Sequence, residues 1–333
     1  MPLTPWCNGS TTGFGPVSLG SNPDGVAIFT EIRFIGQVLN MAIFDLHLHT
    51  CWSYDAFSRP ADYFRFAAEK NVRAIAVTDH HLMDGYGEVL KAAAAYPETG
   101  WIAGAELTVH CQLGNFDLVC LNLPVDPGPE LAAVFELYRN WQVASGTALS
   151  VNFCRRGYAF DDAARLELLR SYRPPEVIAR QGNTHVRSGI LKQYFLENGL
   201  CSDEDQYNTL RQSFTDLPNY PEYDQVIPAV KKAGGIVIIA HPYNYFLKDD
   251  RSRMDELREM FQLDGIECAH HSVPQEMTPV YRAYCLEHGL LSSGGSDLHR
   301  PVIEEFACHC GAPEWLDELL ERVKIHHGTG DLK

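Results

Sequence analysis

The sequence is poor in basic residues. Its 333 residues include 27 Lys and Arg against 43 Asp and Glu, which gives a formal net charge of −16. Such a surface repels DNA duplexes, which bind to basic faces of proteins. It does not exclude a small phosphorylated substrate, because bound divalent cations can dominate the local field inside a site. The composition therefore argues against a duplex-binding module and leaves nucleotides and short RNA open.

Several other features are missing. No apolar run approaches the ~20 residues that cross a bilayer, so we expect no membrane partner. The ten cysteines follow no disulfide framework, and Cys308 and Cys310 have no second pair with which to build a zinc finger. Reduced thiols and the lack of a signal-peptide pattern predict a cytoplasmic protein. Because no Gly-rich phosphate loop or Ser-centred elbow is present, phosphate binding must rest on metal ions and basic side chains.

Residues 1–40 differ from the rest of the chain. They are rich in turn-forming residues and show neither helical nor strand periodicity. Met41 stands immediately before the first strand-like run. Our hypothesis is that Met41 is the true start, and that residues 1–40 are a non-native or disordered extension translated from upstream sequence.

Strand-like and helical patterns alternate in two blocks of the chain. Residues 41–125 predict strands through Phe44 and at 73–77, 101–105 and 116–121, with helices at 60–70 and 87–95. Residues 225–305 resume the alternation, with strands at 236–240, 265–267 and 290–293 and a helix at 274–288. This spacing favours a parallel α/β sheet or barrel. Residues 126–224 predict a helical insertion with helices at 130–145, 161–170, 174–180, 186–198 and 203–212, and residues 306–333 predict a helix at 313–324 and a polar tail.

Four strand-like runs end in His or Asp. The segments are His47-Leu48-His49, Thr78-Asp79-His80-His81, Ala240-His241-Pro242 and Ser296-Asp297-Leu298-His299. Successive strand side chains point to opposite faces, so positions 47 and 49 project on the same side. Ligands gathered from several strand ends are typical of a barrel active site, and they predict a metalloenzyme. Unless the fold brings them to this site, structural roles are assigned to His81, His270, His288, His309, His326 and His327.

These segments, with Ser53-Tyr54-Asp55 and Gly104-Ala105-Glu106, resemble the PHP (polymerase and histidinol phosphatase) metal-dependent phosphoesterases. The resemblance covers about 41–123 and 225–303 in the same order. Asp264-Gly265-Ile266-Glu267, the long insertion and Asn183-Thr184-His185-Val186 are most similar to the branch that hydrolyses nucleotide phosphates and trims short RNA from its 5′ end.

The resemblance implies a fold, a set of ligands and a cofactor. The fold would be a distorted (β/α)7 TIM-like barrel with a helical insertion, holding two or three divalent ions such as Mn, Zn or Fe. The first ion would be held by His47, His49, Glu106 and Asp297; the second by Glu106 and His241; and the third by Asp55, His80 and His299. Asp117 stands where the family usually has a His, so the second site either favours Mn or Mg over Zn or is weak. Asp79 is expected to orient an imidazole, and His110 is an alternative ligand.

The function implied is hydrolysis of phosphate esters of nucleotides or short RNA 5′ ends by metal-activated hydroxide. Candidate phosphate clamps or leaving-group acids are His185, Arg187, His271 and Arg300, for each of which an ordinary surface or capping role stays open. Arg187 lies one helical turn from Asn183, where that branch tends to have an Arg. A histidinol-phosphate phosphatase and a non-catalytic metal-binding or proofreading module are the alternatives. The long insertion favours the nucleotide, which needs a larger lid.

Overall fold

The structure, a computed structural model, describes residues 43–329. The expectations for residues 1–40 and for a start at Met41 lie outside the described residues. Within residues 43–329, no helix is both long enough and apolar enough to span a bilayer.

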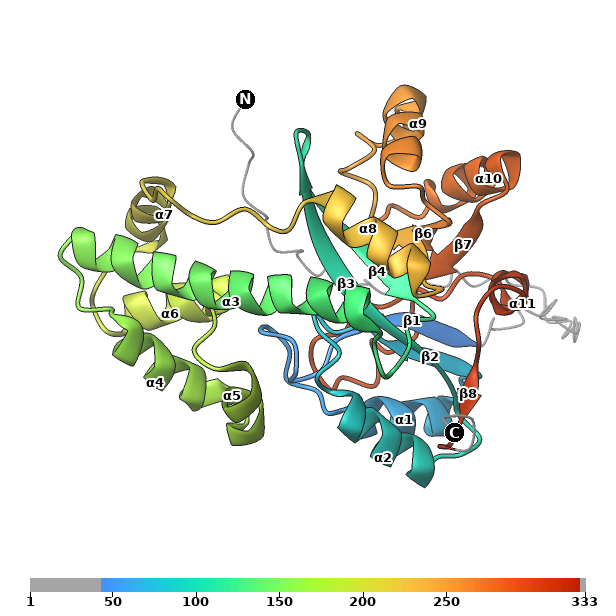
Figure 1. Cartoon of the computed structure of the whole chain (residues 1–333), viewed down its shortest axis with the longest axis horizontal. Helices are drawn as coiled ribbons and strands as arrows, with labels where there is room; N and C mark the ends of the chain where they lie inside the picture. Colours follow the sequence, from blue (N-terminus) through green and yellow to red (C-terminus); the bar gives the residue numbers. More distant parts are fainter. Residues whose placement is uncertain (1–42, 330–333) are drawn as a thin grey trace, which may run out of the picture. The chain divides into compact units, whose positions relative to one another are not determined.

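Seven strands lie side by side in chain order and form a nearly closed barrel (Figure 1). The barrel closes where the chain after the last strand meets the first. There the His49 amide donates to the Leu298 carbonyl at 3.1 Å and the Asp297 amide donates to the His47 carbonyl at 2.9 Å. This arrangement confirms the predicted distorted (β/α)7 barrel. The strands are β1 (Phe44–Leu48), β2 (Ala74–Val77), β3 (Gly100–Cys111), β4 (Gly114–Leu121), β5 (Ile236–Ile239), β6 (Gly265–Ala269) and β7 (Leu291–Gly294), and the short β8 (His326–His327) pairs with β3.

The sheet departs from the expected parallel arrangement at β4, which runs antiparallel to both β3 and β5. The strand predicted at 101–105 continues to Cys111, so Glu106 lies inside β3 and not after its end. The chain then reverses through a tight turn in which Gly114 has a φ of 124°, a conformation that glycine adopts without steric cost. An antiparallel pair needs no crossover helix, which explains why none separates β3 from β4.

Six helices accompany the barrel strands. Helix α1 shows why such helices form: Pro60 occupies its first turn, the Arg59 amide donates to the Asp62 carboxylate at 2.8 Å, and Tyr63, Phe64 and Phe66 are buried. Helix α9 was not predicted, because Met254 and Leu257 are its only buried residues and its other residues are mostly charged. The six helices are α1 (Pro60–Lys70), α2 (Tyr86–Ala95), α8 (Tyr223–Lys232), α9 (Arg251–Met260), α10 (Thr278–His288) and α11 (Pro313–Leu320).

The five remaining helices lie between β4 and α8 and have a core of their own, which includes Leu149, Phe153 and Phe195. They are α3 (Pro129–Arg155), α4 (Asp162–Tyr172), α5 (Pro175–Gln181), α6 (Ser188–Glu197) and α7 (Glu204–Gln212). Helix α3 continues past the predicted end at residue 145. Gly146 lies inside this helix at a position where a Cβ would lie 2.7 Å from the Thr184 carbonyl oxygen. The glycine permits close packing of α3 against the segment between α5 and α6.

The loop after β2 holds the helical segment to the barrel. Asp84 in this loop accepts two hydrogen bonds of 2.8 Å from the Arg139 guanidinium of α3, and it also accepts from Arg180 Nε at 3.0 Å. Arg173 reaches the loop after β1 and donates to the Trp52 and Ser53 carbonyls at 3.3 Å. These contacts fix α3 and α5 beside the ends of β1 and β2.

Candidate metal centre

The two histidines at the end of β1 are both fully buried, and hydrogen bonds orient both rings. His47 Nδ1 lies 3.0 Å from Glu267 Oε1, and His49 Nδ1 lies 3.2 Å from Ser53 Oγ. Ser53 Oγ donates to Asp79 at 2.9 Å, so it accepts from the His49 ring. A proton held on Nδ1 leaves Nε2 free as a ligand. Asp79 thus orients an imidazole as expected, but it acts through Ser53.

Glu106 occupies the middle of the site, and its side chain is 1% exposed. Its Oε2 lies 3.4 Å from His47 Nε2, 3.3 Å from His49 Nε2 and 2.9 Å from His80 Nδ1. Its Oε1 lies 3.1 Å from His241 Nε2 on the other side. One carboxylate therefore turns one oxygen towards three imidazoles and the other towards a fourth, an arrangement that suits a carboxylate shared between two cations.

Asp297 completes the first group. Its Oδ1 lies 3.0 Å from His49 Nε2 and 3.6 Å from His47 Nε2. The segment that carries Asp297 is fixed by the buried Asp45, which accepts hydrogen bonds from the amide of the preceding Ser296 at 2.9 Å and from its hydroxyl at 2.6 Å. Asp297 has a φ of 52°, a left-handed conformation that non-glycine residues rarely adopt and that gathers at functional sites.

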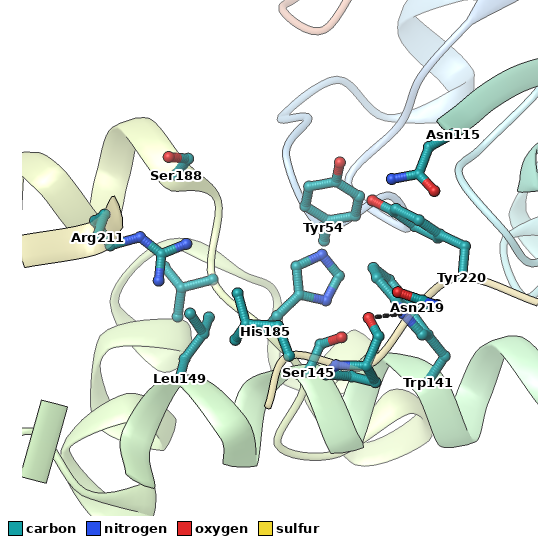
Figure 2. A pocket seen from close by; sticks show the side chains of 13 residues that line it. Tyr54, Asn115, Trp141, Ser145, Leu149, His185, Ser188, Arg211, Asn219 and Tyr220 are labelled. Atoms are coloured by element: carbon teal, nitrogen blue, oxygen red, sulfur yellow. Dashed lines mark hydrogen bonds between the residues drawn. The ribbon is translucent and has the colours of Figure 1, made fainter. Parts of the chain in front are cut away.

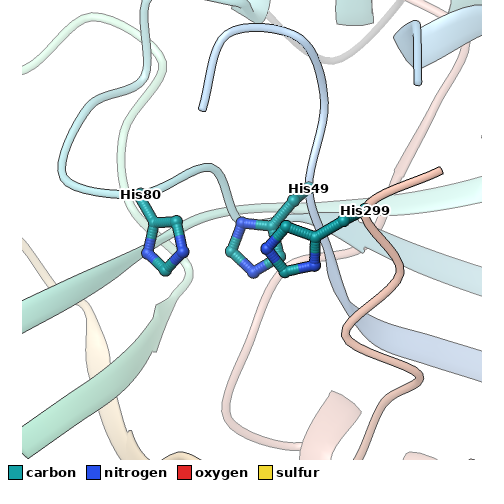
Figure 3. Close-up of side chains that lie close together, drawn as sticks. All are labelled: His49, His80 and His299. Atoms are coloured by element: carbon teal, nitrogen blue, oxygen red, sulfur yellow. The ribbon is translucent and has the colours of Figure 1, made fainter. Parts of the chain in front are cut away.

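A second group forms around Asp55, whose Oδ2 lies 3.5 Å from His80 Nε2 and 3.3 Å from His299 Nε2. The His49 ring lies between the other two imidazoles, with centroid distances of 4.4 Å to His80 and 4.3 Å to His299. Figure 3 shows the three rings converging from separate segments of the chain. Their ligand atoms lie within 4.8 Å of one another, close enough to surround one ion.

A third group combines Glu106, His241 and Asp117, the residue at which the sequence departs from the family pattern. Asp117 Oδ2 lies 3.7 Å from His241 Nε2. The Asp117 carboxylate is positioned by the Thr108 hydroxyl at 2.6 Å and the Tyr245 hydroxyl at 2.8 Å. Two carboxylates and one imidazole make this the most oxygen-rich of the three groups.

The charges of the site depend on one another. Burial lowers the pKa of His47, but Glu267, Glu106 and Asp297 outweigh burial and raise the pKa well above its usual value. Burial likewise raises the pKa of Glu106, but His47 and His80 outweigh it and hold the pKa well below the usual range. The site is thus a close set of opposite charges with little access to water.

Ligand atoms at the centre of the site are buried and form no hydrogen bond of acceptable geometry within residues 43–329, although His80 Nδ1 lies only 2.9 Å from Glu106 Oε2. They are His47 Nε2, His49 Nε2, His80 Nδ1, Asp55 Oδ1 and Glu106 Oε2. Buried polar atoms normally have partners, and unpaired groups of this kind call for an ion. Imidazole nitrogens with carboxylate oxygens are the ligands of Zn, Mn and Fe. The donor set therefore fits divalent metal ions.

Two residues that were not predicted as ligands also lie at this centre. Glu267, besides its contact with His47, accepts a hydrogen bond of 2.6 Å from the His241 amide and so connects two of the groups. His270 was assigned a structural role, yet its Nε2 lies 3.4 Å from Asp297 Oδ2. The signal for His270 was present, because it directly follows β6 as the other histidines follow their strands.

Three of the four residues predicted to handle phosphate, Arg187, His271 and Arg300, are at least partly exposed, whereas His185 is buried. Arg187 and Arg300 each place the guanidinium carbon 5.9 Å from the centroid of the exposed Phe57 ring, so the fold brings these two cations to one surface near Asp55. His271 is exposed, with its ring 4.1 Å from that of His270. His185 lies inside a cavity described below. His110, the alternative ligand, instead bonds to Asn115 at 2.9 Å and joins none of the ligand groups found among residues 43–329.

A cavity of about 400 Å³ lies beside the metal-ligand groups, between the loop after β1 and the helical segment (Figure 2). Tyr54 forms its near wall, with ring centroids 5.0 Å from His80 and 4.2 Å from His185. Trp141 and Tyr220 form an aromatic wall and stack at 4.0 Å. Burial is the main cause that lowers the pKa of His185 to about 3; Arg173 and His80 act in the same direction, and Asp55 opposes them. The His185 ring is therefore neutral, and a cationic phosphate clamp at this position is not what its surroundings favour.

The barrel and these ligand groups define an α/β-barrel protein with clusters of candidate metal ligands at its strand ends. Residues 45–262 match the model of the PHP domain, which is more than half of the chain, so the chain belongs to the PHP domain family. The family suggested by the sequence motifs is thereby confirmed.

Two curated relatives and a solved structure show how far the similarity extends. A 3′,5′-nucleoside bisphosphate phosphatase from Chromobacterium violaceum is 28% identical over 275 residues, covering 78% of this chain and 88% of the relative. A 5′-3′ exoribonuclease from Haemophilus influenzae is 24% identical over 269 residues, covering 78% and 90%. The structure of a Chromobacterium violaceum amidohydrolase with bound sulfate and no metal has a TM-score of 0.66 and 24% identity, covering 88% of this chain and 100% of that one. At that identity the structure shows a shared fold.

Proposed function

We propose that the protein is a metal-dependent phosphoesterase that removes phosphate from nucleotides or acts at the 5′ ends of short RNA. One observation carries the proposal: Glu106 turns Oε2 to His47, His49 and His80 and Oε1 to His241. A carboxylate shared in this way can hold two cations close together while reducing their mutual repulsion.

The residues that would hold the ions follow from the three groups. The first ion would be held by the first group, His47, His49, Glu106 and Asp297. The second ion would be held by the group that contains Asp117, with Glu106 and His241. The third ion would be held by the group around Asp55, with His80 and His299. Bound divalent ions would lower the pKa of a water molecule towards neutrality and neutralise phosphoryl oxygens. Two to three ions of Mn, Zn or Fe suit this set, and the oxygen-rich group with Asp117 favours Mn.

Neighbouring residues would hold the metal ligands in the orientation needed for binding. Glu267 holds the His47 ring and the His241 amide, and Ser53 holds the His49 ring. Arg187 and Arg300, whose guanidinium carbons each lie 5.9 Å from the Phe57 ring centroid, would contact phosphate oxygens of a substrate. His270 would hold the second oxygen of Asp297.

The cavity supports a nucleotide as the substrate. Aromatic rings such as Trp141 and Tyr220 offer the flat surfaces on which nucleobases stack. The two curated relatives are named for a nucleoside bisphosphate and for RNA. Histidinol phosphate, the alternative, is smaller and has less surface with which to fill about 400 Å³. A non-catalytic module is disfavoured because the ligand set is nearly complete, with Asp117 at the position where the family usually has a His.

The test combines metal analysis with a substrate panel. We expect the purified protein to carry two to three divalent ions and, with added Mn, to hydrolyse a nucleotide faster than histidinol phosphate. Asp297→Asn should lower kcat by at least about 10³-fold, since it removes a ligand charge, while unfolding at nearly the wild-type temperature. Asp126→Asn, which changes an exposed carboxylate, is the matched control and should retain full activity. A metal-free protein that Mn, Zn and Fe all fail to activate would disprove the proposal.

A further inference from the structure

Arg211, in the last turn of α7, lines the cavity. Its guanidinium lies 4.7 Å from the Phe214 ring centroid, and its Nη1 is buried without a hydrogen-bond partner among residues 43–329. Burial lowers the pKa of Arg211, and Tyr207 is the neighbour that opposes the shift. Figure 2 shows the guanidinium reaching towards His185 from the side opposite Trp141 and Tyr220.

The two fully buried arginines of the helical segment have carboxylate or amide partners, although Arg173 Nε lacks one, whereas Arg211 is partly buried and its Nη1 has no partner within residues 43–329. Arg165 binds the Asp162 carboxylate at 2.6 Å, and Arg173 binds Gln181 Oε1 at 2.6 Å. Withdrawing part of a cation from water without such partners is unfavourable, unless an anion compensates. A guanidinium also matches the oxygens of a phosphate in a two-point contact. The surroundings of Arg211 therefore fit an anionic ligand inside the cavity.

The cavity has three different walls, and a nucleotide with two phosphates has three matching parts. Tyr54 separates the cavity from the metal-ligand groups, where the reacting phosphate would lie. Trp141 and Tyr220 offer stacking surface to a base. Arg211 supplies a positive charge on the opposite side, away from both. A nucleoside monophosphate has no second phosphate to contact that third wall.

We propose that Arg211 binds a second phosphate of the substrate, so that the enzyme prefers nucleotides carrying two phosphates over those carrying one. The proposal rests on the nucleotide phosphoesterase function proposed above. The second phosphate can be a monoester, as in a nucleoside bisphosphate, or the diester linkage of a short RNA, since both present anionic oxygens. Arg211 would act in binding and selectivity, not in the chemical step.

Arg156 provides a matched control. Its guanidinium lies 4.9 Å from the same Phe214 ring, but it is satisfied by Ser213 and Asn152 and does not line the cavity. If Arg211 only packs on Phe214, the substitutions Arg211→Gln and Arg156→Gln should have similar effects. If Arg211 binds phosphate, only Arg211→Gln should change substrate selectivity.

The experiment measures kcat and KM of the Mn-loaded full chain with adenosine 3′,5′-bisphosphate, with AMP and with a 5′-phosphorylated dinucleotide. Arg211→Gln should lower kcat/KM for substrates with a second phosphate by about 10–100-fold, mainly through KM, the loss expected for one charge-assisted contact. AMP hydrolysis should change by less than about threefold. Arg156→Gln should leave all three substrates near wild type. A selective loss on the bisphosphate alone identifies the monoester, and one on the dinucleotide alone identifies the diester.

An equal loss on AMP and on both two-phosphate substrates, or no loss on any, would overturn the assignment of Arg211. Should Arg211→Gln fail to fold, Arg211→Lys keeps the charge but not the two-point contact, and a selective loss of about 3–10-fold is then expected. Failure of the proposed function is distinguishable, because in that case the wild-type protein hydrolyses none of the three substrates.

Discussion

Replacing His185 with Gln should make the protein less sensitive to acid. His185 is 9% exposed, and burial lowers its pKa to about 3, helped by Arg173 and His80 and opposed by Asp55. In the unfolded chain its pKa would return to the ordinary histidine value of 6.5. Below pH 6.5 the His185 ring therefore binds a proton in the unfolded chain but stays neutral in the folded protein. This contribution to stability is complete above pH 6.5 and is lost progressively as the pH falls towards 3.

The size of the effect follows from the two pKa values. Each pH unit between them changes the free energy of unfolding by about 1.4 kcal/mol, so a fall from pH 7 to pH 5 should cost about 2 kcal/mol through His185 alone. The result at pH 5 hardly depends on the folded value, because any folded pKa below about 4 leaves the ring neutral there. A glutamine side chain at this position has no proton to gain, so the variant should lack this loss.

The assay is urea unfolding of wild type and His185→Gln at pH 7 and pH 5, with metal present throughout. Lost ring contacts with Tyr54 and Trp141 weaken the variant equally at both pH values, and acid acts on the metal ligands in both proteins. The loss of unfolding free energy between pH 7 and pH 5 is measured for each protein, and the loss in wild type minus the loss in the variant gives the contribution of His185. A value below about 0.5 kcal/mol would mean that the folded protein protonates His185, and the ring would then return as a cationic phosphate clamp.

Two further predictions concern the attachment of the helical segment and the metal ligands. Asp84→Asn should lower the free energy of unfolding in urea by about 2 kcal/mol, because it weakens the contacts of a buried carboxylate with Arg139 and with the more exposed Arg180; an unchanged midpoint would contradict this. Burial lowers the pKa of His241, but Glu106 and Asp117 outweigh it and raise the pKa to about 9, so metal must displace a proton. Mn affinity should therefore rise by up to about tenfold per pH unit between pH 6 and 9, and calorimetry in buffers of different ionisation enthalpy should detect the released proton; a pH-independent affinity would refute it.

Much of the site was determined by local sequence. A strand followed by His-x-His must place both imidazoles on one side, whatever the rest of the fold does. Pro60 and the buried aromatic residues that follow it were enough to predict α1 with its correct ends. The alternation of strand and helix patterns left an α/β sheet or barrel open, and the resemblance of the ordered motifs to the PHP family implied the barrel.

Only the tertiary structure decided the features that depend on contacts between distant segments. The antiparallel course of β4 results from pairing with both β3 and β5, and local pattern alone does not distinguish it from a parallel strand. Gly146 reads as a helix break in the sequence, but it is explained by its approach to Thr184. His270 became part of the metal centre only because the pairing of β6 with β7 brings Asp297 to it. Arg211 looks like any exposed cation of a polar helix until the cavity shows a guanidinium nitrogen with no hydrogen-bond partner within residues 43–329, since burial and pairing are properties of the folded chain.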